Sequence, residues 1–142
     1  MARIKLQLPT NFSFSTSIPI RITDMNYANH LGNDAVLSIL HEARVQFLKS
    51  IGYKELEFEG IGLIMSDVAI EFKAEAFYGE TLKAFVTAGE FSRVGFDLYY
   101  KLIKSETEEI VAVAKTGMIC FDYSSKKVTS VPKEAITKLS GT

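Results

Sequence analysis

The chain has 142 residues, and sixteen Lys and Arg against seventeen Asp and Glu give it a net charge of −1. This length fits one compact unit with its own core, so we expect a single domain over residues 1–142. The balanced charge argues against a protein built mainly to neutralise a nucleic-acid backbone. The single cysteine, Cys120, excludes a disulfide framework.

The first residues form no apolar stretch of the kind that a secretory signal needs, and no window approaches the roughly eighteen apolar residues of a membrane span. We therefore expect a cytoplasmic protein with no membrane span. The only histidines are His30 and His41, and the helix that would contain His41 lacks the second histidine of a zinc-binding helix. No metal site is expected.

The first predicted element is a strand. Residues 17–23 alternate between isoleucine and other residues, which is the period of a half-buried strand. Pro19 has no N–H to give to a neighbouring strand, so we expect this strand at an edge of its sheet. A polar and turn-prone stretch follows over residues 24–34.

A long helix is predicted next, from about Ala35 to Ile51. Asn33 or Asp34 would cap its amino end, and Gly52 would end it. Its apolar positions at helical spacing are Val36, Ile39, Leu40, Ala43, Phe47 and Ile51, with Leu37, Val45 and Leu48 widening the apolar surface. As the only long helix, it should be largely wrapped by a sheet.

Strand patterns fill the chain from residue 61 to residue 123. Apolar residues alternate over residues 67–73, 82–88 and 96–100, and residues 110–121 form a longer, more continuously apolar run that indicates a central strand. We expect these four strands to be joined by short hairpins, one of them with the charged tip Glu106–Glu109. Residues 132–139 predict one short final helix.

This order of elements predicts an α+β fold in which an antiparallel sheet wraps one long central helix. The edge strands of such a sheet have unpaired backbone groups, which favours pairing with a second copy. We therefore expect a homodimer.

The polar stretch before the helix holds most of the residues with chemical potential. The sequence has no nucleophile elbow, no phosphate-binding glycine loop and no cluster of cysteine or histidine. The start of a buried helix presents unpaired N–H groups and a partial positive charge. Such a helix start can polarise a carbonyl oxygen or hold an oxyanion.

The residues of this stretch also form a recognisable motif, and three helix residues accompany it: Arg21-x-x-Asp24-x-Asn26-x-x-x-His30-Leu31-Gly32-Asn33, then Glu42-Ala43-Arg44. The pattern resembles that of the hot-dog-fold acyl-CoA thioesterases of the 4-hydroxybenzoyl-CoA thioesterase type. The turn Tyr78-Gly79-Glu80 is similar to a Gly-Asp turn of that family. The resemblance extends over essentially the whole chain.

The resemblance implies a hot-dog fold and hydrolysis of an acyl thioester, carried by coenzyme A or by acyl carrier protein, to the free acid and the thiol. It implies a homodimer, with a homotetramer left open. It implies no cofactor apart from the coenzyme A of the substrate.

One residue departs from the family pattern. The family's second acidic residue acts as nucleophile or base, and Asn26 stands in its place. Asparagine has no carboxylate and cannot accept a proton from water at neutral pH. The first acidic place is kept as Asp24, and His30 matches a histidine of the plant acyl carrier protein thioesterases.

These matches give candidate roles. The backbone N–H of Asn33 would hold the thioester oxygen, and Asn26 would orient water or the carbonyl. The base is left open among four residues: Asp24, His30, Asp34 and Glu42. Structural alternatives are a turn-closing Asp24, capping by Asn33 or Asp34, and a His30 that only bonds its loop.

Other residues have two possible roles each. Candidates for an acyl tunnel, or for ordinary core packing, are Leu40, Phe47, Ile64 and Met65. Candidates for contact with coenzyme A phosphates are Arg3, Lys73, Lys83 and Arg93. Arg44 is expected to hold a loop or a neighbouring subunit through carboxylates. Because of Asn26, a hot-dog protein that binds acyl thioesters without hydrolysing them remains an alternative, and a pure interaction module has only the sheet edge in its favour.

Overall fold

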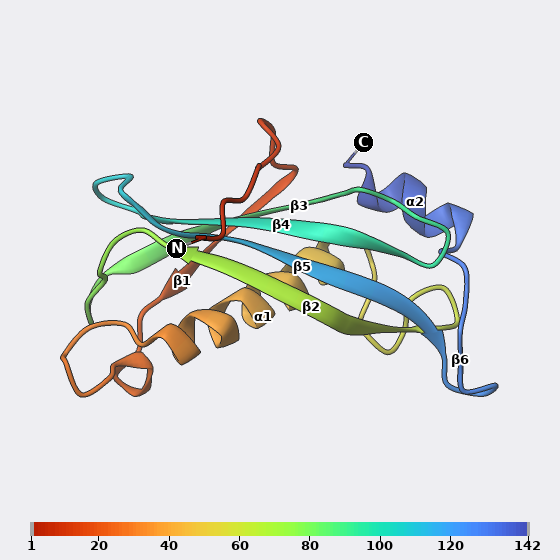
Figure 1. Ribbon diagram of the computed structural model, residues 1–142, viewed down its shortest axis with the longest axis horizontal. Coiled ribbons are helices and arrows are strands. Elements are labelled where there is room, and N and C mark those ends of the chain that lie inside the picture. Colours follow the sequence, from red (N-terminus) through yellow and green to blue (C-terminus); the bar gives the residue numbers. More distant parts are fainter. Residues whose placement is uncertain (1, 142) are drawn as a thin grey trace.

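The computed structural model describes residues 2–141, which form one antiparallel sheet and two helices (Figure 1). A short 3-10 turn at Ile22–Asp24 precedes the long helix. In chain order the elements are β1 (Phe14–Pro19), α1 (Asn33–Ser50), β2 (Gly62–Phe72), β3 (Thr81–Gly89), β4 (Gly95–Lys104), β5 (Ile110–Asp122), β6 (Lys127–Val128) and α2 (Lys133–Leu139).

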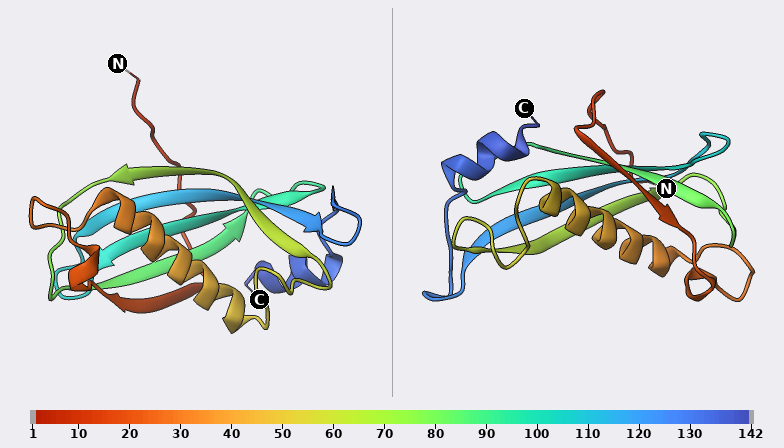
Figure 2. Two further views of the ribbon diagram at one scale, coloured as in Figure 1. Left: turned by 90° about the horizontal axis from the view of Figure 1, so that it is seen from below. Right: turned by 180° about the vertical axis from the view of Figure 1, so that it is seen from behind.

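The strand order across the sheet is β1-β3-β4-β5-β2, with the short β6 paired to the end of β5. Helix α1 lies on one face, here called the inner face, and α2 packs at the end of the sheet away from the start of α1 (Figure 2). Strand β5 is central and pairs with both β4 and β2, as predicted. The predicted α+β fold, an antiparallel sheet packed against one long helix, is confirmed.

The inner face and α1 together form the core. Five of the six predicted core positions of α1 are at most 2% exposed, and Leu48 is fully buried. The helix packs closest to β1 and β3. Its other side is left open, with Leu37 and Val45 exposed by 38% and 44%. The sheet therefore covers one side of the helix rather than surrounding it.

The predicted amino-terminal caps of α1 are wrong. The helix begins at Asn33, and the extended residue before it, Gly32, is the N-cap and supplies no side chain. Asp34 consequently lies within the first turn and not before it. At the other end Gly52 has a positive φ of 87°, as expected of the residue that ends this helix.

The first strand is displaced from its predicted place. It spans Phe14–Pro19 and ends where the 3-10 turn approaches. The Arg21 N–H donates to the Asp24 carboxylate at 2.8 Å, and this contact closes the turn. The alternating pattern therefore fails at Ile22, which is 67% exposed. Strand β1 is an edge strand, as Pro19 predicted.

The hairpin expected between β2 and β3 is also wrong. Strand β2 pairs with β5 and not with β3, so residues 73–80 cross the end of the sheet. This crossing segment is held to the loop before α1, because the Leu31 N–H donates to the Ala76 carbonyl at 2.7 Å. The two remaining connections are hairpins, as predicted, whereas β6 was not predicted.

Arg44 holds a loop, as one of its two predicted roles requires. Its Nε donates to Glu55 at 2.9 Å, and its Nη1 lies 3.4 Å from the Tyr100 hydroxyl, which lies 2.7 Å from Thr116. Burial lowers the pKa of Arg44, but its contacts with Tyr100 and Glu55 raise the pKa by more than burial lowers it. The net shift is upward, so the guanidinium stays charged. The loop after α1 is thus tied to the core through one buried cation.

Replacing Glu55 with alanine should destabilise the protein, because it leaves the buried guanidinium without its carboxylate. Glu55 is itself 27% exposed, so we expect a loss of about 2 kcal/mol, below the range for a fully buried pair. Urea unfolding measures it. Glu57→Ala, which removes an exposed carboxylate from the same loop, should cost less than about 0.5 kcal/mol. Equal costs for the two variants would contradict this role of Arg44.

Candidate functional site

The loop before α1 is closed by backbone hydrogen bonds. The Gly32 N–H donates to the Asp24 carbonyl at 3.0 Å, and the Asn26 N–H donates to the His30 carbonyl at 2.9 Å. A Cβ on Gly32 would lie 2.6 Å from an Asp34 carboxylate oxygen, so this glycine lets the Asp34 side chain fold back over the loop. The motif residues are therefore held close together just before the helix.

Asp24 is buried, and its carboxylate is already occupied. It accepts the Arg21 N–H, and the Arg21 guanidinium lies 3.2 Å away. Only 4% of Asp24 is exposed. The geometry gives Asp24 the turn-closing position that the sequence offered as its structural alternative.

Asn26 organises the loop from within. Its side-chain oxygen accepts the Ala28 N–H at 2.9 Å and the His30 N–H at 3.4 Å. The side-chain oxygen is thereby engaged, and the amide nitrogen is the end that is left for other contacts. An aspartate could accept the same two bonds, so asparagine keeps the loop shape without the charge.

The start of α1 borders a cavity of about 250 Å³, here called the helix-start cavity. Its walls come from the loop, from α1, from the end of β2 with the crossing segment, and from β5: His30, Leu31, Asn33, Val36, Phe72, Lys73, Ala74, Glu75 and Val111. The first bond of the helix runs from the Val36 N–H to the Gly32 carbonyl. The N–H groups of residues 33–35 therefore have no acceptor within the helix.

His30 lies in the wall of this cavity in a defined state. Its Nδ1 lies 3.1 Å from the Leu31 carbonyl oxygen. A carbonyl only accepts, so the neutral ring carries its proton on Nδ1 and leaves the lone pair on Nε2. The structure thus brings two predicted site residues, His30 and Asn33, to one cavity.

Glu42 is not part of that cavity. It borders a separate one of about 360 Å³ between β1 and the exposed side of α1, together with Arg21 and His41. Its carboxylate accepts a hydrogen bond from Gln46 at 2.7 Å. Glu42 and Asn33 stand nine positions apart, which places them on opposite sides of a helix. The predicted set of site residues is therefore divided between two places.

The crossing segment supplies cavity residues that sequence reasoning did not select. Lys73, Ala74 and Glu75 line the helix-start cavity beside Phe72. The turn Tyr78-Gly79-Glu80 was the one signal near them, and it pointed to a hairpin. Their place follows from the pairing of β2 with β5, which no local pattern reveals.

The four acyl-tunnel candidates take different positions: two lie on α1 and two on β2. Leu40 and Phe47 are buried in the core. Met65 faces inward opposite Met118, whereas Ile64 faces outward opposite Ile119.

Within residues 2–141, no group of three or more histidine, cysteine or acidic side chains could hold a metal ion, and no helix is long and apolar enough to cross a membrane.

Comparison with known proteins gives one family. The chain matches the thioesterase-like superfamily over residues 20–139. A protein of Aquifex aeolicus (strain VF5) named "Putative esterase" is 29% identical over 100 residues, which are 69% of this chain and 75% of that protein.

Two solved structures show the same fold. A 1,4-dihydroxy-2-naphthoyl-CoA thioesterase from Synechocystis superposes with a TM-score of 0.81 at 22% identity, over 89% of this chain and 94% of that one. A mutant of 4-hydroxybenzoyl-CoA thioesterase, with asparagine in place of an aspartate and complexed with 4-hydroxybenzoyl-CoA, superposes with a TM-score of 0.80 at 17% identity, over 89% and 98% of the two chains. These are hot-dog proteins, so the hot-dog fold is confirmed.

The loop role of Asn26 predicts unequal effects of two substitutions. Asn26→Asp should change the free energy of unfolding by less than about 0.5 kcal/mol, because a carboxylate accepts the same two hydrogen bonds, whereas Asn26→Ala should cost about 1–2 kcal/mol. Urea unfolding measures both. Asn33→Ala is the matched control, since the side chain of this exposed asparagine is not needed as a cap. An Asn26→Ala variant as stable as the control would refute the loop role.

Proposed function

The chain belongs to the thioesterase-like superfamily, and from this premise we propose that it hydrolyses an acyl thioester of coenzyme A to the free acid and the thiol. The observation that supports this most directly is the meeting of His30 and the uncapped start of α1 at one cavity. A base and an oxyanion-binding group are the two parts that hydrolysis of a thioester requires.

The start of α1 supplies the oxyanion-binding part. The thioester oxygen would lie against the free N–H groups of the first turn, with Asn33 foremost. The attraction between the positive end of the helix dipole and that oxygen grows as negative charge develops on the oxygen. No side-chain cap competes for these N–H groups, because the N-cap is Gly32.

His30 supplies the base. Its Nε2 would take a proton from water while the water oxygen forms a bond to the thioester carbon. When the tetrahedral intermediate collapses, the carbon–sulfur bond breaks and the imidazolium returns the proton to the leaving thiolate. The bond from Nδ1 to the Leu31 carbonyl holds the ring in the tautomer that this cycle needs. The reaction requires no cofactor beyond the coenzyme A of the substrate.

The other predicted site residues take supporting parts in this scheme. Asp24 and Asn26 shape the loop that presents His30, and the Asn26 amide nitrogen can still reach a carbonyl or a water. Glu42 lies in the other cavity and takes no part within its own chain.

A second copy would close the site. Strand β2 is an edge strand of eleven residues, and its inward side chains Met65, Val68 and Phe72 are 37–49% exposed. The uncovered side of α1 adds Leu37 and Val45 to this apolar surface. Phe72 also lines the helix-start cavity. We propose that β2 pairs with β2 of a second copy, so that the dimer covers this surface and encloses the acyl group.

Substitution of His30 tests the proposed reaction. His30→Ala should lower kcat on a susceptible acyl-CoA by at least about 100-fold, the usual contribution of a general base. Free thiol released from acyl-CoA substrates of several chain lengths and ring types measures it. His41→Ala is the matched control, because His41 lies on α1 but outside the helix-start cavity. The kcat of this variant should stay within about threefold of wild type.

Three outcomes would overturn the reaction as written. Equal activity of the two histidine variants would remove His30 as base. Absence of turnover on every substrate, with binding of coenzyme A intact, would select the alternative of a non-hydrolytic acyl-thioester-binding protein, which the neutral Asn26 favours. Absence of both turnover and binding would leave an interaction module.

The proposed dimer predicts different effects on the two faces of β2. Val68 and Ile64 are each 39% exposed, but Val68 faces inward opposite Thr116 and Ile64 faces outward opposite Ile119. Val68→Asp should give a monomer, because it places a charge in the apolar surface, and Ile64→Asp should leave the dimer intact. Light scattering over a range of concentrations measures the mass. A wild-type protein that is monomeric throughout would rule out the dimer.

A further inference from the structure

The amino-terminal segment crosses the outer face of the sheet, the face opposite α1. At β2 the Leu6 N–H donates to the Glu71 carboxylate at 2.8 Å. At β3 the ring of Phe12 lies 6.0 Å from that of Phe85. Figure 2 shows this segment running across the strands before it turns into β1. It therefore adds side chains to the outer face that the strands alone do not supply.

Strand register places the crossing over one row of side chains. Phe85 of β3 is paired with Lys101 of β4, which is paired with Val113 of β5, which is paired with Glu71 of β2. Val113 is only 6% exposed although it lies outside the main core cluster. The segment therefore packs on this row and holds its neighbours in place.

Two ammonium groups are held against one ring in this row. The Nζ atoms of Lys83 and Lys101 each lie 5.1 Å from the centre of the Phe85 ring, and Lys101 Nζ also lies 5.3 Å from the centre of the Phe12 ring. The two charges are thus no further apart than twice the distance to Phe85. This upper limit of about 10 Å equals one Debye length at roughly 0.1 M salt.

These two lysines differ from the others on the outer face. Lys115 is paired with Asp67 and Asp97, and Lys73 is paired with Glu71. Lys83 and Lys101 make no ion pair within residues 2–141. An aromatic ring positions an ammonium group but does not cancel its charge, and the N–H groups that point away from the ring can still donate. The pair is therefore a positioned double cation without an anion.

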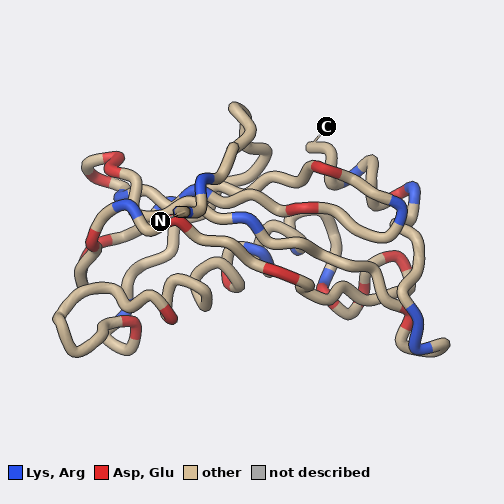
Figure 3. The backbone as a smooth tube through the Cα atoms, viewed as in Figure 1, with Lys and Arg blue, Asp and Glu red and all other residues tan. Residues whose placement is uncertain are grey.

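We propose that Lys83 and Lys101 bind the phosphate groups of the coenzyme A nucleotide, which rests on the proposed function. Phosphate groups are the part of that substrate that needs a cation, and two ammonium groups at this spacing can contact a diphosphate or the separate ribose phosphate. Figure 3 shows Lys and Arg gathered where the amino-terminal segment crosses the sheet. Lys5 adds to this charge. The pKa of the Glu71 carboxyl is lowered mainly by the hydrogen bond from the Leu6 N–H, and the positive charges of Lys73 and Lys5 lower it further.

The reach from the helix-start cavity fits this assignment. The cavity is lined at the end of β2 by Lys73, and two strand spacings of about 4.8 Å separate β2 from Lys101 on β4, roughly 10 Å in all. The pantetheine arm between the thioester sulfur and the diphosphate has the length of about four extended residues, or roughly 14 Å. The arm is therefore longer than the lateral distance that it has to span across the strands.

The assignment excludes two of the basic residues considered from sequence. Arg93 lies beyond the other end of β3 from Lys83, at the hairpin that leads into β4. Lys73 is already paired with Glu71. Lys83 and Arg3 remain of the four, and Lys101 joins Lys83 at the ring of Phe85.

The test compares substrates with and without phosphates. Lys83→Met/Lys101→Met keeps the apolar stems against the rings and removes both charges. On an acyl-CoA its KM should rise about five- to tenfold at low salt, as expected for two exposed charge contacts, and the rise should shrink as salt is added. On the same acyl group carried by N-acetylcysteamine, which has no phosphate, KM and kcat should match wild type.

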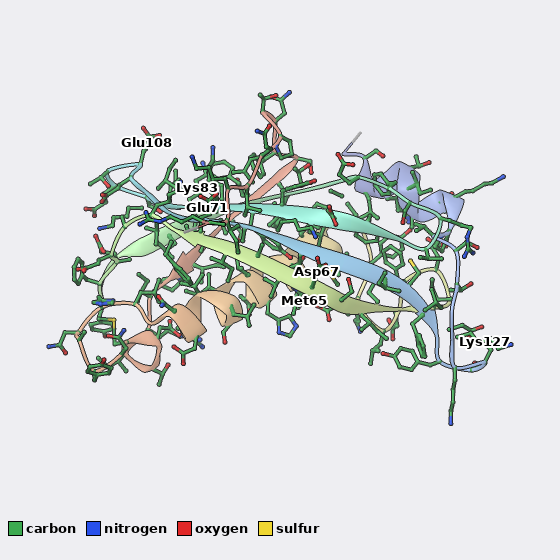
Figure 4. All side chains as sticks on the ribbon, in the orientation of Figure 1. Met65, Asp67, Glu71, Lys83, Glu108 and Lys127 are labelled. Carbon is green, nitrogen blue, oxygen red and sulfur yellow. The ribbon has the colours of Figure 1, made fainter. Side chains whose placement is uncertain are left out.

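The matched control is Lys127→Met/Lys133→Met, which removes two exposed lysines. Figure 4 shows Lys83 over the strands left of centre and Lys127 far from it, at the right end of the molecule. The control should leave KM unchanged for both substrates. The assignment is overturned if the Lys83/Lys101 variant changes KM for acyl-CoA by less than twofold, or changes KM equally for both substrates.

Binding of coenzyme A, measured by calorimetry, separates this proposal from the proposed reaction. If wild type hydrolyses neither substrate, the reaction fails, yet a five- to tenfold weaker Kd of the Lys83/Lys101 variant would still support the phosphate site. An unchanged Kd for the variant, or no binding by wild type, would reject the site. Coenzyme A lacking the ribose phosphate shows which of the phosphates the pair contacts.

Discussion

The position at which α1 begins depends on two hydrogen bonds made by the residues before it. The Leu31 N–H is tied to the Ala76 carbonyl of the crossing segment, and the Gly32 N–H is tied to the Asp24 carbonyl of the loop. Both bonds come from backbone groups, so they fix the path of the chain without using a side chain. The helix therefore starts just after a glycine that supplies no side-chain cap, between a loop and a segment that come from distant parts of the sequence.

That arrangement explains why the start of the helix can serve a substrate. A side-chain cap would satisfy one of the first N–H groups and add stability of about 1 kcal/mol. This helix lacks such a cap, and its N–H groups border a cavity instead. Because the loop and the crossing segment are bonded to each other, the helix start remains ordered without the cap. The stability that a cap would have contributed is given up at the place where the proposed reaction puts the acyl oxygen.

Sequence reasoning succeeded where a pattern was local and failed where a contact was distant. The buried face of α1, the central β5 and the edge position of β1 all follow from periodicity or from one proline, and all agree with the structure. The start of α1 was misplaced because Asn33 and Asp34 are good capping residues. The choice of Gly32 is made by its bonds to the loop, which lie outside any helix signal.

In the candidate site, too, local patterns were predictable and distant contacts were not. The motif placed His30 and Asn33 near the helix start, but their common cavity depends on the crossing segment, whose course is set by β2 pairing with β5. Glu42 joined the candidates because it stands in the motif, yet helical geometry turns it to another side. The ring state of His30 depends on one carbonyl, that of its own neighbour Leu31, and no spacing rule predicts that contact.

The outer face shows how charge can be assigned once register is known. From sequence, alternation alone does not separate Lys115 from Lys101. Lys115 is ion-paired with Asp67 and Asp97 of the adjacent strands, whereas the Lys101 ammonium lies over the rings of Phe12 and Phe85. The first pair of neighbours cancels a charge, whereas the second pair holds a charge in position and leaves it available. A charged ligand at this face would therefore distinguish lysines that composition treats alike, because what an ammonium group can bind is decided by the side chains on the adjacent strands.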